Sequence, residues 1–161
     1  MSEQIFQKLT ALLDQQQARY RVVEHPTAGK SEEVAKIRGT ELGQGAKALV
    51  CKIKGNGIKQ TVLAILPADR QADLSKIAEY LGGTKASLAS PAEVTELTDC
   101  VFGAIPPFSF HESLMLIADP SLLERYNELA FNAGTLERSI ILNTEDYGKI
   151  VKPTLVQFAK Q

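Results

Sequence analysis

The sequence predicts an α+β fold in a single domain, residues 1–161, from three observations. Helical and strand-like segments follow one another in irregular order, not as a regular succession of βαβ units. A chain of 161 residues is long enough to bury a core without support from a metal or a disulfide. Hydrophobic residues at 44% and charged residues at 23% are in ordinary globular proportion.

The first 66 residues indicate helices, a short strand and a hairpin. Leu9 and Leu13 belong to an apolar stripe at helical spacing. Ser31 is expected to be the N-cap of a second helix, which Gly39 ends. Two β-prone runs flank residues 55–57, rich in Gly and Asn, and the second run is apolar on both faces, as in a central strand. The predicted elements are helices over 3–18 and 31–38 and strands over 20–24, 47–54 and 59–66.

The rest of the chain continues in the same mixed manner. The glycine pair at 82–83 ends a helix. Ser90 and Glu93 have capping-box spacing, with Pro91 at the first helical position. The closing helix bends or ends near Pro153. The predicted elements are helices over 71–81, from 90 and from 144, a short helix capped by 119–120, and strands over 101–104, 114–118, 129–132 and 139–142.

Composition excludes several classes of protein. A formal net charge of −1 argues against broad, sequence-independent nucleic-acid binding. The same net charge is compatible with a local basic face that binds only the end of a nucleic acid. The N-terminus lacks a secretory pattern, and no apolar run reaches the length of a membrane span. Cys51 and Cys100 form no C-x-x-C pair, and His and Cys show no metal-ligand spacing. We therefore expect a cytoplasmic protein with reduced thiols and no metal, cofactor or membrane partner.

Lys47 is the most informative single residue. On a strand it shares a face with Leu49, Cys51 and Ile53, which we expect to point into the core. An unpaired buried ammonium is very costly, so such a lysine must reach a cavity, a partner or a ligand. The alternative is that position 47 precedes the strand and its side chain extends outward to solvent.

A stiff loop follows the predicted strand at 101–104. Gly103 is followed by Pro106 and Pro107, so few N–H groups are available there. A rigid loop of this kind can present the Gly103 N–H to a substrate carbonyl, in an oxyanion-type role, but an ordinary turn has the same pattern. His25 and His111 could act as general bases, or form hydrogen bonds within loops.

The chain resembles the YbaK/prolyl-tRNA synthetase-associated editing domain family, and most closely its free-standing, YeaK-like branch. The resemblance runs from residues 25–26 through 45–52 to the Asn-Ala-Gly turn at 132–134. It includes a Gly-x-x-x-Pro loop, which Gly103 and Pro107 fit. The resemblance implies an α+β domain with a mixed, largely antiparallel curved sheet or partial barrel surrounded by helices.

The resemblance also implies trans-editing, which is hydrolysis of mischarged aminoacyl-tRNA carrying a small amino acid: alanine, cysteine, serine or threonine. Synthetases discriminate poorly among small side chains, so a second site must clear the errors. Lys47 takes the place of the family's essential lysine and would orient the ester or the adenosine, while the Gly103 N–H polarises the carbonyl. The implied partners are the tRNA acceptor end and, transiently, an aminoacyl-tRNA synthetase. The candidate substrate-binding residues are His25, Ser31, Ile105, Pro106, Pro107, Phe108, His111, Asn132 and Gly134.

Two other functions compete with the editing hydrolase. A non-catalytic module would sequester aminoacyl-tRNA or a nucleotide-like ligand, and would bind without turnover. A structural partner of a synthetase would co-purify with it. The inward alignment of Lys47 favours the hydrolase and the binding module over the structural partner. Packing explains Phe108 and Asn132 as well as a role in the pocket does.

Overall fold

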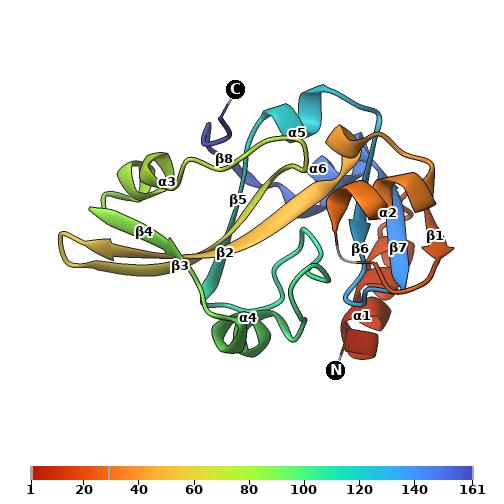
Figure 1. Ribbon diagram of the computed structural model, residues 1–161, viewed down its shortest axis with the longest axis horizontal. Helices are drawn as coiled ribbons and strands as arrows, with labels where there is room; N and C mark the ends of the chain where they lie inside the picture. The colour runs from red at the N-terminus through yellow and green to blue at the C-terminus, as the bar shows by residue number, and fades with distance from the viewer. Residues whose placement is uncertain (1, 29, 161) are drawn as a thin grey trace.

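A computed structural model describes residues 2–28 and 30–160 and confirms the α+β fold (Figure 1). No helix in these residues is both long and apolar enough to cross a membrane. The helices are α1 (Ser2–Gln15), α2 (Ser31–Arg38), the 3-10 helix η1 (Leu42–Gln44), α3 (Leu74–Leu81), α4 (Pro91–Thr98), α5 (Ser121–Glu124) and α6 (Thr144–Val151). The strands are β1 (Tyr20–Glu24), β2 (Ala46–Gly55), β3 (Ile58–Pro67), β4 (Lys85–Leu88), β5 (Leu114–Ala118), β6 (Glu128–Asn132), β7 (Arg138–Asn143) and β8 (Thr154–Leu155).

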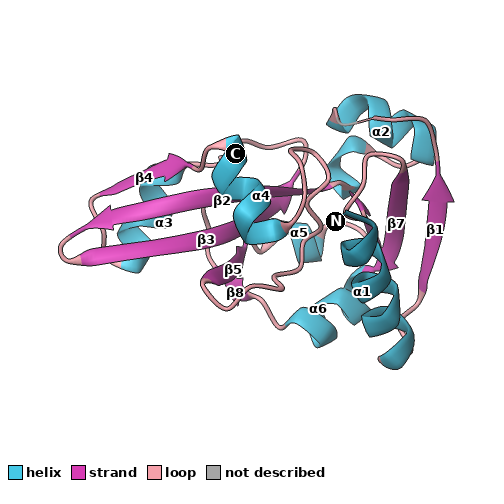
Figure 2. Cartoon of the chain, turned by 90° about the horizontal axis from the view of Figure 1, so that it is seen from below, coloured by secondary structure: helices cyan, strands magenta, loops and turns pink. Residues whose placement is uncertain are grey.

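The strands within the described residues form two sheets, not a single continuous one. One is antiparallel, in the order β1-β7-β6. The other has the order β4-β2-β3-β5-β8, antiparallel around β2 and parallel from β3 to β8. An isolated bridge between Gly45 and Ala130 connects the start of β2 to β6. The long β2–β3 hairpin reaches away from the smaller sheet, which lies at the other end of the molecule (Figure 2).

The hairpin confirms the prediction from the Gly- and Asn-rich turn. Gly55 pairs with Ile58, so Asn56 and Gly57 form a two-residue turn with φ of 54° and 79°. Positive φ at both positions defines a type I′ turn, which suits Asn-Gly and matches the twist of the flanking strands. β3 lies between β2 and β5 and is buried over 62–67, as expected of a central strand.

Both faces of the β2–β3 hairpin are covered. Val50 and Leu63 pack in one hydrophobic cluster with α1, α4 and the smaller sheet. Cys51 and Ile53 pack in a second cluster with Ile77 of α3. α3 and α4 accordingly lie on opposite sides of the hairpin (Figure 1). The face that Lys47 shares with Cys51 and Ile53 therefore points into a core, as predicted.

The predicted strand over 101–104 is wrong. This segment is a loop in which the Ala104 N–H donates to the Val101 carbonyl, at 3.1 Å, and Gly103 has a left-handed φ of 84°. Val101 and Phe102 are 55% and 53% exposed, so these apolar residues lie at the surface and not in the core. The short strands β4 and β8 were not predicted, because a few residues give too weak a β signal.

The helix boundaries depend on caps, and one predicted cap is wrong. Ser31 is the first residue of α2, and its N-cap is Lys30, without a capping side chain. Gly39 ends α2 in the left-handed conformation, as predicted. α3 begins later than expected because Asp73 accepts the Ser75 N–H, at 3.1 Å, and so caps the helix at that point. The capping box at the start of α4 is confirmed.

Asp119 fastens the C-terminal segment to the larger sheet. Its side chain is buried, and its Oδ2 accepts the N–H groups of Phe158 and Ala159, at 2.9 and 2.8 Å. Its Oδ1 accepts the Ser121 N–H and hydroxyl, at 3.0 and 2.6 Å. Burial by itself raises the pKa of Asp119, but the hydrogen bonds from Ser121, Ala159 and Phe158 outweigh it and lower the pKa.

We predict that Asp119→Ala lowers the free energy of unfolding by roughly 3 kcal/mol, because two buried N–H groups lose a charged acceptor. The exposed cap variant Asp73→Ala is the matched control and should cost about 1 kcal/mol. Urea denaturation at neutral pH measures both. The pKa of Asp119 is lower in the folded state than in the unfolded state. Its contribution to the free energy of unfolding is therefore present above the unfolded-state pKa and is lost as pH falls through the folded-state pKa. Equal losses in the two variants at neutral pH would contradict this role.

Candidate functional site

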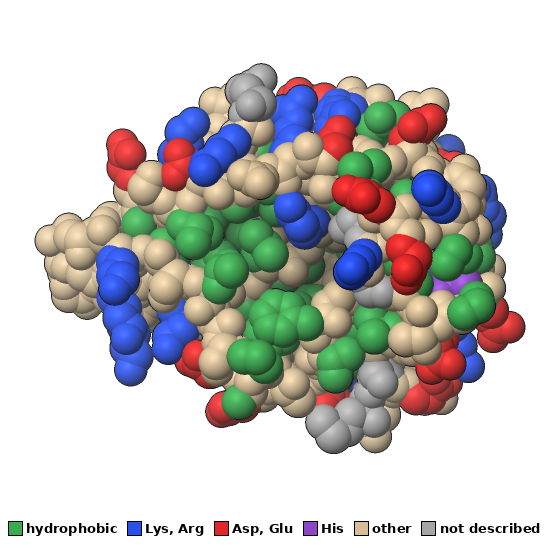
Figure 3. All heavy atoms as spheres, in the orientation of Figure 1, with side chains coloured by type: hydrophobic (Ala, Val, Ile, Leu, Met, Phe, Trp, Pro, Cys, Tyr) green, Lys and Arg blue, Asp and Glu red, His purple; other side chains and the backbone are tan. Residues whose placement is uncertain are grey.

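A cavity of about 200 Å³ opens where the two sheets approach each other. Its walls come from α2, the start of β2, the loop over 102–105, and β6. Figure 3 shows the hollow on one face of the molecule, with basic side chains beside it and hydrophobic side chains along its edge. Segments far apart in the sequence thus meet around one small space.

An unpaired strand edge forms one wall of this cavity. The Val50 carbonyl accepts the Ala89 N–H at 2.9 Å, and β4 pairs with β2 only over 51–54. Alternate residues of a strand direct their backbone N–H and carbonyl groups to the same edge. Ala48 therefore presents its N–H and carbonyl at the edge of β2 where Val50 bonds to Ala89. No described strand pairs with that edge at Ala48, which lines the cavity. The wall therefore offers one backbone donor and one acceptor.

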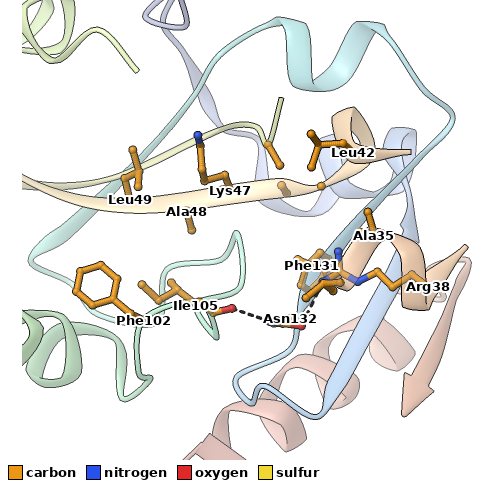
Figure 4. A pocket seen from close by; sticks show the side chains of 16 residues that line it. Ala35, Arg38, Leu42, Lys47, Ala48, Leu49, Phe102, Ile105, Phe131 and Asn132 are labelled. Atoms are coloured by element: carbon orange, nitrogen blue, oxygen red, sulfur yellow. Dashed lines mark hydrogen bonds between the residues drawn. The ribbon is translucent and has the colours of Figure 1, made fainter. Parts of the chain in front are cut away.

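Lys47 lines the cavity, with its ammonium held by a neutral group. Its Nζ donates to the Arg70 carbonyl at 2.6 Å. Burial lowers the pKa of Lys47, and the nearby Asp69 carboxylate partly opposes that shift. In Figure 4 the Lys47 side chain lies on the opposite side of β2 from Ile105, so it does not face the loop directly. Lys47 and Gly103 belong to different walls of the same cavity.

The loop over 102–105 forms the opposite wall. Phe102, Gly103 and Ile105 line the cavity, and Ile105 is buried whereas Phe102 is 53% exposed. The Gly103 carbonyl accepts the Asn132 Nδ2 amide at 2.7 Å. The Gly103 N–H has no acceptor within residues 2–28 and 30–160. That N–H is therefore available to a ligand.

The residues that follow this loop support it from behind. Pro106, Pro107 and Phe108 are buried and do not line the cavity. The Tyr147 hydroxyl donates to the Pro107 carbonyl at 2.7 Å. The Phe108 ring packs on the rings of Phe131 and Tyr147, with centroids 5.8 and 5.4 Å away. These contacts stiffen the wall that carries Gly103.

A polar network reaches the cavity from α2 and β7. Arg38 Nε donates to Ser139 Oγ at 2.8 Å, and its Nη2 donates to Asn132 Oδ1 at 3.2 Å. His25 Nε2 lies 2.8 Å from the same Ser139 Oγ. His25 Nδ1 lies 2.8 Å from the Pro26 carbonyl, which can only accept, so Nδ1 carries a hydrogen. Burial lowers the pKa of Arg38 to about 10.

Several predicted site residues lie away from the cavity. His111 is exposed, and its Nδ1 accepts the Ser113 N–H at 3.1 Å within its own turn. Gly134 donates its N–H to the Ala104 carbonyl at 2.9 Å and so holds the loop from outside. The side chain of Ser31 lies outside the described residues. The predicted residues that do line the cavity are Lys47, Gly103, Ile105 and Asn132.

Arg38 and Phe102 line the cavity, although neither was predicted to be a site residue. A basic residue in the last turn of a helix is explained by the helix dipole, so Arg38 gave no signal of a pocket. Its partners Asn132 and Ser139 are 94 and 101 positions away. Phe102 was placed in a strand, and only its exposure beside Gly103 reveals it.

Comparisons with known proteins show which family this chain resembles. Residues 25–150 match the model of the aminoacyl-tRNA editing domain. The multifunctional Ser/Thr-tRNA deacylase ProXp-y of Escherichia coli K12 is 65% identical over 154 residues, which cover 96% of this chain and 92% of the relative. The prolyl-tRNA editing protein ProX of Acetoanaerobium sticklandii is 27% identical over 151 residues, 91% of this chain and 90% of that protein.

A similar fold occurs in a crystal structure of a candidate trans-editing enzyme for prolyl tRNA synthetase. That structure aligns with a TM-score of 0.80 at 24% identity, over 98% of each chain. Identity this low supports the fold only. The family model covers most of the chain, and the 65% identical relative spans nearly all of it. The chain therefore belongs to the aminoacyl-tRNA editing domain family.

Proposed function

We propose that residues 1–161 form one editing domain that hydrolyses mischarged aminoacyl-tRNA carrying a small amino acid, serine and threonine foremost. The observation that carries the proposal is the single cavity lined by both Lys47 and Gly103. The 65% identical E. coli relative is a Ser/Thr-tRNA deacylase, which supports the same substrate class. The tRNA acceptor end is the proposed partner, with any synthetase contact being transient.

The cavity suits a small aminoacyl group. Its volume of about 200 Å³ is below the usual range of pockets for larger ligands. Ala35, Ala46 and Ala130 contribute small side chains to its buried walls. A small amino acid therefore fits inside, while the terminal ribose and base remain at the mouth, beside the exposed ring of Phe102.

The reaction needs only water as a co-reactant. A water oxygen attacks the ester carbonyl carbon and forms the new bond to the acyl group. The bond from that carbon to the ribose oxygen breaks, and the ribose oxygen takes a proton. Free amino acid and uncharged tRNA leave. An aminoacyl ester is already reactive, so modest stabilisation of the developing oxyanion is enough.

The donors on the cavity walls fit these steps. Lys47 uses one ammonium hydrogen for the Arg70 carbonyl and keeps two for the ester or the ribose oxygens. The Gly103 N–H, which has no acceptor in the described part of the chain, is a suitable donor for the ester carbonyl, where negative charge develops. Terminal ribose hydroxyls or an ordered water would complete proton transfer. Lys47 thus positions the ester, and Gly103 polarises it.

We predict that Lys47→Ala reduces the deacylation rate of serine esterified to a mismatched tRNA by about 100-fold, because a charged donor at the ester is lost. Lys52→Ala is the matched control, since Lys52 lies on the same strand but pairs with Glu93 at 2.8 Å. Single-turnover release of the amino acid measures the rate, and thermal unfolding checks the fold. Full activity in Lys47→Ala would refute the mechanism, and tight binding of aminoacyl-tRNA without any turnover in the unmodified protein would favour a binding module.

A second prediction concerns the backbone of the loop. Replacing Gly103 by glycolic acid turns the amide between Phe102 and Gly103 into an ester, in which an oxygen takes the place of the N–H and no side chain changes. We expect the rate of deacylation to fall by about 100-fold or more, as for the loss of one oxyanion donor. The same replacement at Gly57, in the turn of the hairpin, is the control and should leave the rate unchanged. An unaltered rate for the variant with glycolic acid at position 103 would show that another donor binds the substrate carbonyl.

A further inference from the structure

Arg38 stands out because it is a cation in the cavity wall without an anionic partner. In the described part of the chain its guanidinium contacts the neutral side chains of Ser139 and Asn132 and no carboxylate. A guanidinium has five N–H donors. The Nη1 hydrogens and one Nη2 hydrogen have no acceptor among the described residues. Arg38 is partly buried and lines the cavity, so these donors are open to an acceptor that a ligand brings.

The neighbours of Arg38 cannot meet that need themselves. Asn132 Oδ1 is within bonding distance of both Arg38 Nη2 and Ser139 Oγ, at 3.2 and 3.1 Å. Its Nδ2 donates to the carbonyls of Ala28 and Gly103, at 3.0 and 2.7 Å. The amide is therefore saturated and rigidly placed. Arg38 is locked in position by this amide and offers its remaining hydrogens to whatever occupies the cavity.

Arg38 belongs to the enclosed end of the cavity. The lining residues around it, Val34, Ala35 and Asn132, are buried, whereas Phe102 at the other side is half exposed. Figure 4 shows the Arg38 side chain reaching from α2 towards Asn132 and Phe131. A group that enters deepest, beyond the ester, meets the guanidinium. In an aminoacyl ester the α-ammonium and the amino-acid side chain both lie beyond the ester. Only the side chain can offer an acceptor to the guanidinium, because an ammonium has none and carries the same charge.

We infer that Arg38 determines specificity by donating a hydrogen bond to the side-chain hydroxyl of the aminoacyl group. The inference rests on the proposed function and adds how the site selects its substrate. Serine and threonine supply the acceptor, and alanine does not. A site built to bond a hydroxyl rejects the analogue that lacks it, since the donor of the site then loses its acceptor. The surrounding alanines provide space but no polar contact.

The test compares serine and alanine esterified to the same tRNA, so that every contact outside the side chain is constant. In Arg38→Met we expect the single-turnover rate for the serine ester to fall by about 10- to 100-fold, as for a hydrogen bond to a charged donor. The rate for the alanine ester should change by less than about threefold. Arg38→Lys keeps the charge but loses the planar guanidinium. Its rate for the serine ester should lie between the rates of the unmodified protein and of Arg38→Met. Arg21→Lys is the control, because Arg21 is exposed and pairs with Glu128 at 3.3 Å.

The outcomes separate this inference from the proposed function. A lower ratio of serine to alanine rates in either Arg38 variant supports the inference, and thermal unfolding shows which variants are folded. Equal losses for both esters in folded variants would overturn it, since Arg38 would then bind the ribose or a phosphate common to both substrates. No hydrolysis of either ester by the unmodified protein would overturn the proposed function itself.

Discussion

The site depends on the unequal pairing of β2. β3 covers one edge of this strand along its whole length, but on the other edge β4 stops short of Val50. The bridge between Gly45 and Ala130 ties the start of the strand to β6 and the smaller sheet. The gap between these contacts, at Ala48, is therefore a break in the sheet edge that other elements must line. α2 and the loop over 102–105 approach it without closing it, and the cavity is what remains.

Asn132 holds this arrangement together at its enclosed end. One amide connects the loop at Gly103, the segment before α2 at Ala28, and the guanidinium of Arg38. Because the amide is buried, each bond lost leaves a polar group without water, so the positions of the three segments are coupled. Ser139 extends the coupling to His25. His25 belongs to this network and lies one step removed from the cavity lining.

Local signals in the sequence were sufficient for most elements and insufficient for the pocket. The hairpin, the glycine end of α2 and the capping box of α4 follow from residues that are adjacent or a few positions apart. The inward alignment of Lys47 was predicted because the alternation of side chains along a strand is also a local signal. Arg38 was missed because its meaning comes from Asn132 and Ser139, which are distant in sequence. Phe102 was assigned to a strand because β propensity cannot distinguish an apolar residue of the core from one at the rim of a pocket.

The distribution of charge around the cavity explains how a chain with a net charge of −1 can bind a polyanionic substrate. Asp69 is the carboxylate that could neutralise Lys47, but it forms a two-pronged contact with Arg125, at 2.8 and 2.7 Å. Lys47 is left with a neutral carbonyl, and Arg38 with neutral side chains. The cavity therefore keeps positive charge that Asp69 offsets only in part, together with excess donors, while acidic residues elsewhere balance the total. Such a site favours oxygen acceptors such as an ester, a ribose and a hydroxyl, and selects them by position, not by long-range attraction.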